Sequence, residues 1–565
     1  MQGSRPFLIR AISEIRGFLS SHEAHPMGTP PDPTNEPSLP AEIDEVVAEV
    51  VSEAHVQAGA LKPEERAYLK EHALKKPMGV LHIWALGVGV VITGEYFGWN
   101  PGLKEGGPLG MLLASLFVCA LYMMWVLALS ELSVALPFAG GPLAYGRRAV
   151  GPWLGFVMGW SMFLESLFAT IGTAIATGGA VFFLANLLAP KSLQAISIDL
   201  HLVAATASPE EIAVTTRLAM TTAFGLLTVG GFALVQWIGA KEQARLMEWM
   251  TYGAIVGLVW FWIAALPDVD LDRVFTTPRL VNGWEGVLKA IPYAIWFLVM
   301  IETVALAPEE AHEPHRTIPR GLALAQVTLI VLVLLTWFFV SAATVDYTKT
   351  ADVLYPLQHV YQEVWPGQQN LWHLVPFALI ALFGMVTSYN GMIYAVSRQS
   401  FALGRAGYLP QFLGHVHPTR RTPDISIVFW SLVVVGFVIW GYFNENAVLV
   451  AVLTCNLTAL IWYVLAIICL FTLRIKEPNM ERPYKVPLYP VLPALVVIMS
   501  IFAAGVYAIY GSPSGAPTGR PWFDDYIVLW LTLFMYAVGL AYYFGFARNR
   551  LVSAAPEELA ARARQ

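Results

Sequence analysis

The sequence predicts an all-α integral membrane protein with twelve transmembrane helices. Hydrophobic residues make up 56% of the 565-residue chain and charged residues only 13%, whereas about a quarter of the residues in a soluble globular chain are charged. Apolar runs of ~20 residues recur along the chain, and a helix of that length crosses the hydrocarbon core of a bilayer. Polar segments containing Lys and Arg separate these runs.

The twelve predicted spans follow one another from residue 79 to residue 546. In order, they cover residues 79–103, 109–136, 153–189, 216–238, 244–266, 290–308, 321–343, 371–403, 425–443, 447–473, 489–510 and 525–546. The third run is long enough to tilt strongly or to extend beyond the membrane.

Three regions are expected. Residues 1–75 form a polar extension rich in Pro and Glu, in which 25–40 are predicted to be disordered and 42–74 to include amphipathic helix. Residues 76–550 form the membrane domain, and 551–565 form a short C-terminal tail.

The distribution of Lys and Arg predicts the orientation. With both termini in the cytoplasm, the cytoplasmic connections and flanks hold 18 of the 34 basic residues and the opposite side holds 8. Cytoplasmic loops of membrane proteins carry such an excess. We therefore expect a multi-pass protein of the cytoplasmic (cell) membrane with both ends inside.

Several classes of function are disfavoured. The three cysteines lie in apolar runs without CxxC spacing, which predicts neither a metal site nor a disulfide framework. The chain has no nucleotide-binding loop and no HExxH or GxSxG motif. We expect no enzyme and no cofactor, and the net charge of -6 argues against nucleic acid as a partner.

Three carboxylates lie deep in predicted spans: Glu95, Glu165 and Glu302. Glu131 lies near the cytoplasmic end of the second span, and no Lys or Arg lies equally deep. A charge at membrane depth costs at least ~2.5–3.5 kcal/mol, so such a group needs a partner or a neutral form. The acids are protonated, bind a cation, or line a wet pocket for a cationic ligand; the alternative is a neutral acid hydrogen-bonded to a neighbouring helix.

Four segments between the spans carry a family resemblance. They are "PFAGGPLAYGRRAVGP" (137–152), "APEEAHEPHRTIPRG" (307–321), "SRQSFALGRAGYLP" (397–410) and "RIKEPNMERPYKVPLYP" (474–490). The residue types in these four segments, and the order of the segments, resemble the loops of the amino acid–polyamine–organocation (APC) superfamily of transporters. The resemblance covers about residues 62–550. The resemblance implies a LeuT-like fold, with a 5+5 inverted repeat, interrupted helices 1 and 6, and two extra helices.

Two further stretches are most similar to ethanolamine permeases. They are "LGVGVVITGEYFGWN" (86–100) and "IWFLVMIETVALAPEE" (295–310). "FLESLFAT" (163–170) keeps the acid found in the third span of those proteins but departs from the residues that follow it. On glycines alone, helix packing is the better explanation of the first stretch. Its pairing with the sixth span favours a binding site.

The resemblance implies specific roles. Residues Thr93 and Gly94 mark the first break, and Glu95 disfavours a substrate carboxylate. Glu165 and Thr170 line the pocket, Trp296 forms an aromatic gate, and Glu302 contributes to gating. We further expect one or two of Glu95, Glu165 and Glu302 to hold the ammonium group of the substrate. The predicted substrate-binding residues are Thr93, Gly94, Glu95, Glu165, Thr170, Trp296 and Glu302, and the predicted gating or coupling residues are Trp296, Glu302 and Glu131.

The predicted function is import of a small amine, most simply ethanolamine, by alternating access. Protons are the expected coupling ion; sodium is the alternative, with Thr387 and Ser388 as oxygen ligands unless they only pack helices. An amino acid or polyamine permease or exchanger is the alternative transporter. A sensor built on the same fold is the alternative of another class.

Overall fold

A computed structural model describes residues 63–562 except 73, 75, 77, 205–206, 276–279, 367–370, 445 and 512–523. The expectations for residues 1–62, including the disordered stretch at 25–40, lie outside the described residues.

Among the described residues, ten helices are long and apolar enough to cross a membrane. They are α6 (Pro101–Ala135), α8 (Pro152–Leu188), α10 (Pro209–Ile238), α11 (Ala240–Ala265), α14 (Pro314–Ala343), α17 (Leu371–Arg405), α18 (Asp424–Gly441), α19 (Ala447–Lys476), α20 (Val491–Tyr510) and α22 (Ile527–Gly545). Each coincides with one predicted span.

The first and sixth predicted spans are interrupted. The first consists of α4 (Val80–Val91) and the one-turn helix α5 (Thr93–Tyr96). The sixth consists of α13 (Gly283–Ile295) and the 3-10 helix η3 (Ile301–Leu306). Each interrupted span is followed by four continuous helices, and α20 and α22 come last. The predicted fold class is confirmed.

Several helices begin well before their predicted spans, and α6 and α10 show why. In α6 the helix starts at Pro101 and continues across a kink at Gly107, whose φ of 69° suits glycine, followed by Pro108. In α10 the helix starts at Pro209 because Ser208 and Glu211 form a reciprocal capping box. Capping and proline chemistry, which hydropathy ignores, set these ends.

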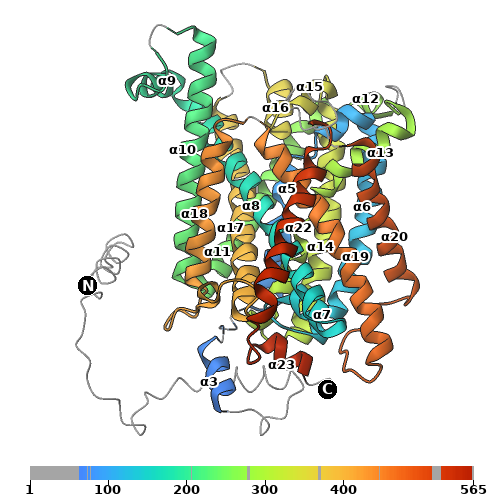
Figure 1. Cartoon of the computed structure of the whole chain (residues 1–565). Coiled ribbons are helices and arrows are strands. Elements are labelled where there is room, and N and C mark those ends of the chain that lie inside the picture. The colour runs from blue at the N-terminus through green and yellow to red at the C-terminus, as the bar shows by residue number, and fades with distance from the viewer. Residues whose placement is uncertain are drawn as a thin grey trace, which may run out of the picture. The chain divides into compact units, whose positions relative to one another are not determined.

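Shorter helices lie at the two ends of the spanning helices (Figure 1). The end with α3 (Pro63–Glu71), α7 (Gly141–Ala149) and α23 (Pro556–Arg562) is called the α7 side. The end with α9 (Pro190–Asp199), α12 (Leu271–Phe275), α15 (Tyr347–Asp352) and α16 (Pro356–Val364) is called the α9 side.

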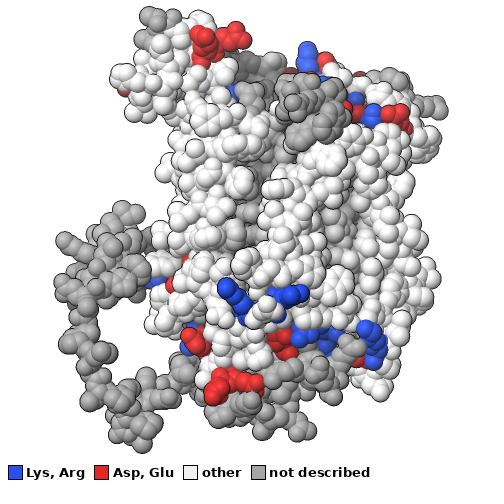
Figure 2. Space-filling model, in the orientation of Figure 1, with Lys and Arg blue, Asp and Glu red and all other residues white. Residues whose placement is uncertain are grey.

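Charged side chains gather toward these two ends, and the surface between them is largely uncharged (Figure 2). A broad uncharged belt is what contact with lipid hydrocarbon requires. The spanning helices and the uncharged belt together indicate a multi-pass membrane protein.

Candidate functional site

The break in the first spanning segment is bridged by a side chain from α17. The backbone N–H of Thr93 donates to the hydroxyl of Ser388 at 2.9 Å, and this hydroxyl donates to the carbonyl of Gly89 at 2.7 Å. Ser388 thus connects the backbone on the two sides of the break. The backbone N–H of Thr93 at the break therefore already has a hydrogen-bond partner.

The two breaks are in direct contact. A Cβ atom built on Gly94 would lie 2.4 Å from the carbonyl oxygen of Trp296, so only glycine permits this approach. The ring of Trp296 is 1% exposed and meets the ring of Phe97 edge-on, with centroids 5.6 Å apart. Trp296 therefore packs against the first break, and its role as a gate stays a prediction.

The second break is built from proline and an unusual backbone conformation. Pro292 lies inside α13, which ends at Ile295. Met300 then adopts a left-handed conformation, with φ of 80°, immediately before η3. A bulky residue in this region is strained, which fits a position held in place by its surroundings at a functional site. This conformation starts the turn that carries Glu302.

Glu302 and Glu165 form a buried carboxyl pair. Both side chains are 0% exposed and interact with each other, although Glu165 comes from α8 and Glu302 from η3. Nε1 of Trp462 donates to Oε2 of Glu165 at 2.5 Å, and the hydroxyl of Tyr463 donates to Oε1 of Glu302. Among the described residues, Oε1 of Glu165 and Oε2 of Glu302 have no hydrogen-bond partner apart from the facing carboxyl group of the pair.

Aromatic side chains of α6 and α19 surround this pair. The ring of Trp125 stacks on Tyr463 with centroids 4.3 Å apart and meets Trp462 edge-on at 5.0 Å. The hydroxyl oxygens of Tyr463 and Tyr122 are 3.0 Å apart. Sequence reasoning missed these four residues, and its only signal was the adjacent Trp-Tyr pair in the tenth span.

Glu95 lies apart from the carboxyl pair. It is completely buried, and the side chains that interact with it include the hydroxyl of Thr336 on α14 and the thiol of Cys119 on α6. Within the described part of the chain, neither of its carboxyl oxygens has a partner at hydrogen-bond distance. The three deep acids therefore divide into a pair and a single residue.

Two other predicted residues, Thr170 and Glu131, have hydrogen-bond partners within the protein. The hydroxyl of Thr170 donates to the carbonyl of Ser166 at 2.6 Å, one turn earlier in α8. Glu131, at the α7-side end of α6, receives two hydrogen bonds from Arg474, at 2.8 and 2.6 Å, and one from the backbone N–H of Val486 at 2.7 Å. The structure does not bring Glu131 to the carboxyl pair, and its coupling role stays a prediction.

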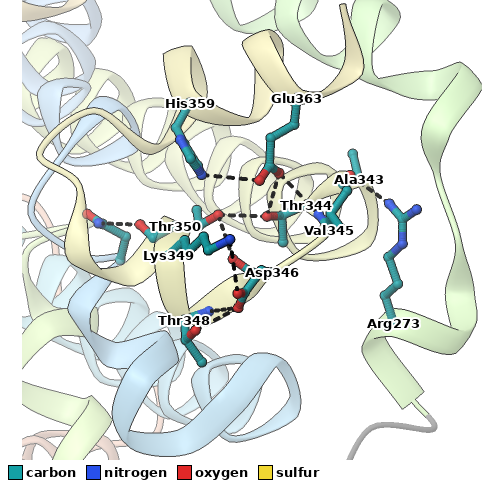
Figure 3. A network of polar contacts seen from close by, with 11 residues as sticks. Arg273, Ala343, Thr344, Val345, Asp346, Thr348, Lys349, Thr350, His359 and Glu363 are labelled. Carbon is teal, nitrogen blue, oxygen red and sulfur yellow. Dashed lines mark hydrogen bonds and ion pairs between the residues drawn. The ribbon is translucent and has the colours of Figure 1, made fainter. Parts of the chain in front are cut away.

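A polar network on the α9 side holds the end of the first spanning segment (Figure 3). Glu363 of α16 accepts a hydrogen bond from Thr344 at 2.9 Å and pairs with His359 at 3.3 Å. The hydroxyls of Thr344 and Thr350 are 2.6 Å apart, and the amide of Asn100 donates to the Thr350 carbonyl at 2.9 Å. The end of "GEYFGWN" is thereby tied to α15 and α16.

Ion pairs on the α7 side join the sixth spanning segment to α17. Arg405 pairs with Glu309 at 2.7 Å and with Glu557 of α23 at 2.6 Å, and Arg398 pairs with Glu310 at 2.9 Å. All five side chains are at most 4% exposed. Both arginines lie near the end of α17, and the C-terminal tail was not expected to join this network.

Comparisons with known proteins agree with the fold and identify the family. A family model described as amino acid permease matches residues 78–533. An uncharacterised transporter of Rhizobium meliloti is 28% identical over 78% of this chain and 89% of its own. The branched-chain amino acid permease of Bacillus subtilis is 26% identical over 76% and 88%, and the methylthioribose transporter of the same organism is 27% identical over 86% and 96%.

Proposed function

The chain belongs to the amino acid permease family, and on that premise we propose that it imports a small amine without a carboxyl group, most simply ethanolamine. Import proceeds by alternating access across the cytoplasmic membrane. The α7 side faces the cytoplasm in this proposal, because most connections rich in Lys and Arg lie there. Protons are the proposed coupling ion.

One observation carries the proposal. Glu165 and Glu302 come from the two halves of the fold and meet in the buried interior. Within the described residues, each keeps one carboxyl oxygen free of partners other than the facing carboxyl group. No Lys or Arg interacts with this pair in the described part of the chain. Two free acceptors on acidic groups favour an ammonium group, which donates charge-assisted hydrogen bonds.

The surrounding groups suit a small cation. The ammonium group lies between the free oxygens of Glu165 and Glu302, and the indole face of Trp296 closes over it by a cation–π contact. Thr93 or the backbone beside it accepts the hydroxyl of the substrate. Tyr463 and Trp462 hold the two carboxyl groups in place through their hydrogen bonds. An added carboxylate would be repelled by the pair.

An amino acid is the second candidate because of the relatives. The names of several related proteins specify amino acids, including branched-chain amino acids and serine or threonine. An amino acid would place its carboxylate at the first break, where the Thr93 N–H already binds Ser388. A sensor is the candidate of another class, which would bind the ligand without carrying it across the membrane.

Uptake by the purified full chain in proteoliposomes tests the proposal. We expect ethanolamine to accumulate, putrescine and choline to compete weakly, and alanine and arginine to compete least. Glu165→Gln and Glu302→Gln should each reduce uptake at least about tenfold, because each loses a charged hydrogen bond worth ~1.5–3 kcal/mol. Accumulation of alanine but not ethanolamine would support the amino acid permease. Binding without flux would support the sensor.

A further inference from the structure

The environment of Glu95 differs from that of the carboxyl pair. Glu165 and Glu302 each accept a hydrogen bond from an aromatic side chain of α19. Both oxygens of Glu95, in contrast, lack a partner at hydrogen-bond distance among the described residues. The hydroxyl of Thr336, which faces the carboxyl group, is the polar side chain that interacts with it most directly.

No positive charge compensates Glu95. Its titratable neighbours are Tyr96 on α5 and Cys119 on α6, both of which are neutral when protonated. α14 contributes the hydroxyl of Thr336, and α4 and α17 contribute no charged group that interacts with it in the described part of the chain. An ionised carboxylate that is buried beside a single hydroxyl, without a counter-ion, is strongly disfavoured, so such a group stays neutral.

The position of Glu95 connects its protonation to the closing of the site. Its neighbour Gly94 rests against the backbone of Trp296, and Thr93 is bonded to α17. α5 therefore cannot take up the buried arrangement seen here without burying Glu95 as well. The arrangement in which both breaks are packed together is available only when the Glu95 carboxyl group carries a proton.

We propose that Glu95 is a proton-binding site, separate from the amine site, whose protonation is required for the substrate-occluded state. An O–H bond forms when Glu95 takes a proton from water in an open state, and it breaks when the residue is exposed to water again. Glu165 and Glu302 meanwhile hold the amine. This inference rests on the proposed function for the identity of the amine, but not for the protonation itself.

The experiment compares the wild-type chain with Glu95→Gln, which keeps the shape of the protonated acid. Both are measured from about pH 5 to about pH 9, a range that includes the pKa values documented for buried glutamates. Glu285→Gln, on an exposed i,i+4 pair with Lys289, is the matched control. The first readout is thermal unfolding of the purified protein, which needs no substrate. The second is ethanolamine counterflow in proteoliposomes, which requires occlusion.

The sign of the expected effect follows from proton linkage. The folded chain keeps the Glu95 proton whereas the unfolded chain releases it, so this residue makes the wild type less stable as pH rises. The melting temperature of Glu95→Gln should therefore fall less steeply with pH than that of the wild type and Glu285→Gln. Counterflow by the wild type should decline by up to about tenfold per pH unit above its midpoint, and that of Glu95→Gln should not.

Identical pH dependence of melting in the wild type and Glu95→Gln overturns the inference, as does a loss of stability in Glu95→Gln that is equal at every pH. A folded Glu95→Gln protein that exchanges no ethanolamine, while the wild type does, also overturns it, because Glu95 would then act in amine binding. Absence of ethanolamine counterflow in the wild type contradicts the proposed function, and the melting curves still decide the role of Glu95.

Discussion

Gly94 and Trp296 are packed backbone against backbone, so that a Cβ on Gly94 would lie 2.4 Å from the Trp296 carbonyl oxygen and 3.0 Å from Cα of Phe297. Neither neighbour is a flexible side-chain end that could move aside. The two interrupted helices are about 200 residues apart in the sequence. Their backbones can approach this closely because Gly94 has no side chain.

Replacing Gly94 by alanine should separate the two breaks and reduce ethanolamine uptake. We expect a loss of about a hundredfold, the effect that a misplacement of about 1 Å has on a positioned site. Gly230→Ala in α10 is the matched control, because a Cβ there meets nothing within 4 Å and alanine favours the helix. Uptake by the two variants at equal amounts of folded protein in vesicles checks this. Normal uptake by Gly94→Ala would show that the contact is not required.

Tyr463→Phe should weaken substrate binding because it removes the hydroxyl that bonds Glu302. Loss of a hydrogen bond to a charged group costs ~1.5–3 kcal/mol, which corresponds to roughly a 10- to 150-fold rise in the apparent KM. Tyr252→Phe is the control, since that hydroxyl also bonds a glutamate, Glu248, at 3.1 Å but on the exposed surface. Concentration series of radiolabelled ethanolamine measure both. Equal KM values for the two variants would contradict the proposed site.

Arg405→Gln should destabilise the folded chain strongly. The change leaves Glu309 and Glu557 buried side by side without their shared cation, and breaking a buried ion pair typically costs ~3–5 kcal/mol. Lys104→Gln, which breaks an exposed pair with Asp352, should have little effect. Thermal unfolding in detergent at neutral pH compares them. If both variants melted like the wild type, the network would not contribute to stability.

Acid should weaken the same network. Burial alone would raise the pKa of Glu309, but the charge and hydrogen bonds of Arg405 outweigh burial and lower the pKa below its ordinary value of 4.5. A carboxylate with a lowered pKa contributes stability above its ordinary pKa and loses it as the pH falls below that value. The wild type should therefore lose more stability below about pH 4.5 than Glu309→Gln does. Parallel melting curves across that range would contradict this assignment.

Hydropathy and the loop motifs were sufficient to predict the spans, because lipid exposure imposes a simple length and composition on each helix. The pairing of Glu165 with Glu302 could be predicted from the sequence, since both are acids at membrane depth. The roles of Trp462 and Tyr463 could not be predicted, because aromatic residues are common in spans and nothing in the local sequence distinguishes a hydrogen-bond donor from a packing residue. The separate position of Glu95 depends on the turn at Ile92. After this turn, Thr93 contacts α17, Gly94 contacts the end of α13, and Glu95 interacts with α14.

Ser388→Ala should impair transport because Ser388 spans the first break, accepting from Thr93 and donating to Gly89. Its loss leaves a buried N–H and a buried carbonyl without this partner, at a cost of ~1–3 kcal/mol each if water does not replace it. Ser431→Ala, whose hydroxyl donates only to Ile427 one turn earlier in α18, is the control. Melting temperature and uptake are measured for both variants.

The proposed proton coupling predicts that ethanolamine uptake does not depend on sodium. Replacing sodium by a large organic cation on both sides of the vesicle membrane should therefore leave uptake unchanged. The hydroxyls of Thr387 and Ser388 donate to the carbonyls of Phe383 and Gly89, and a hydroxyl that donates keeps oxygen lone pairs that can bind a cation. If uptake instead required sodium and Ser388→Ala raised the sodium concentration needed, these two hydroxyls would act as ion ligands.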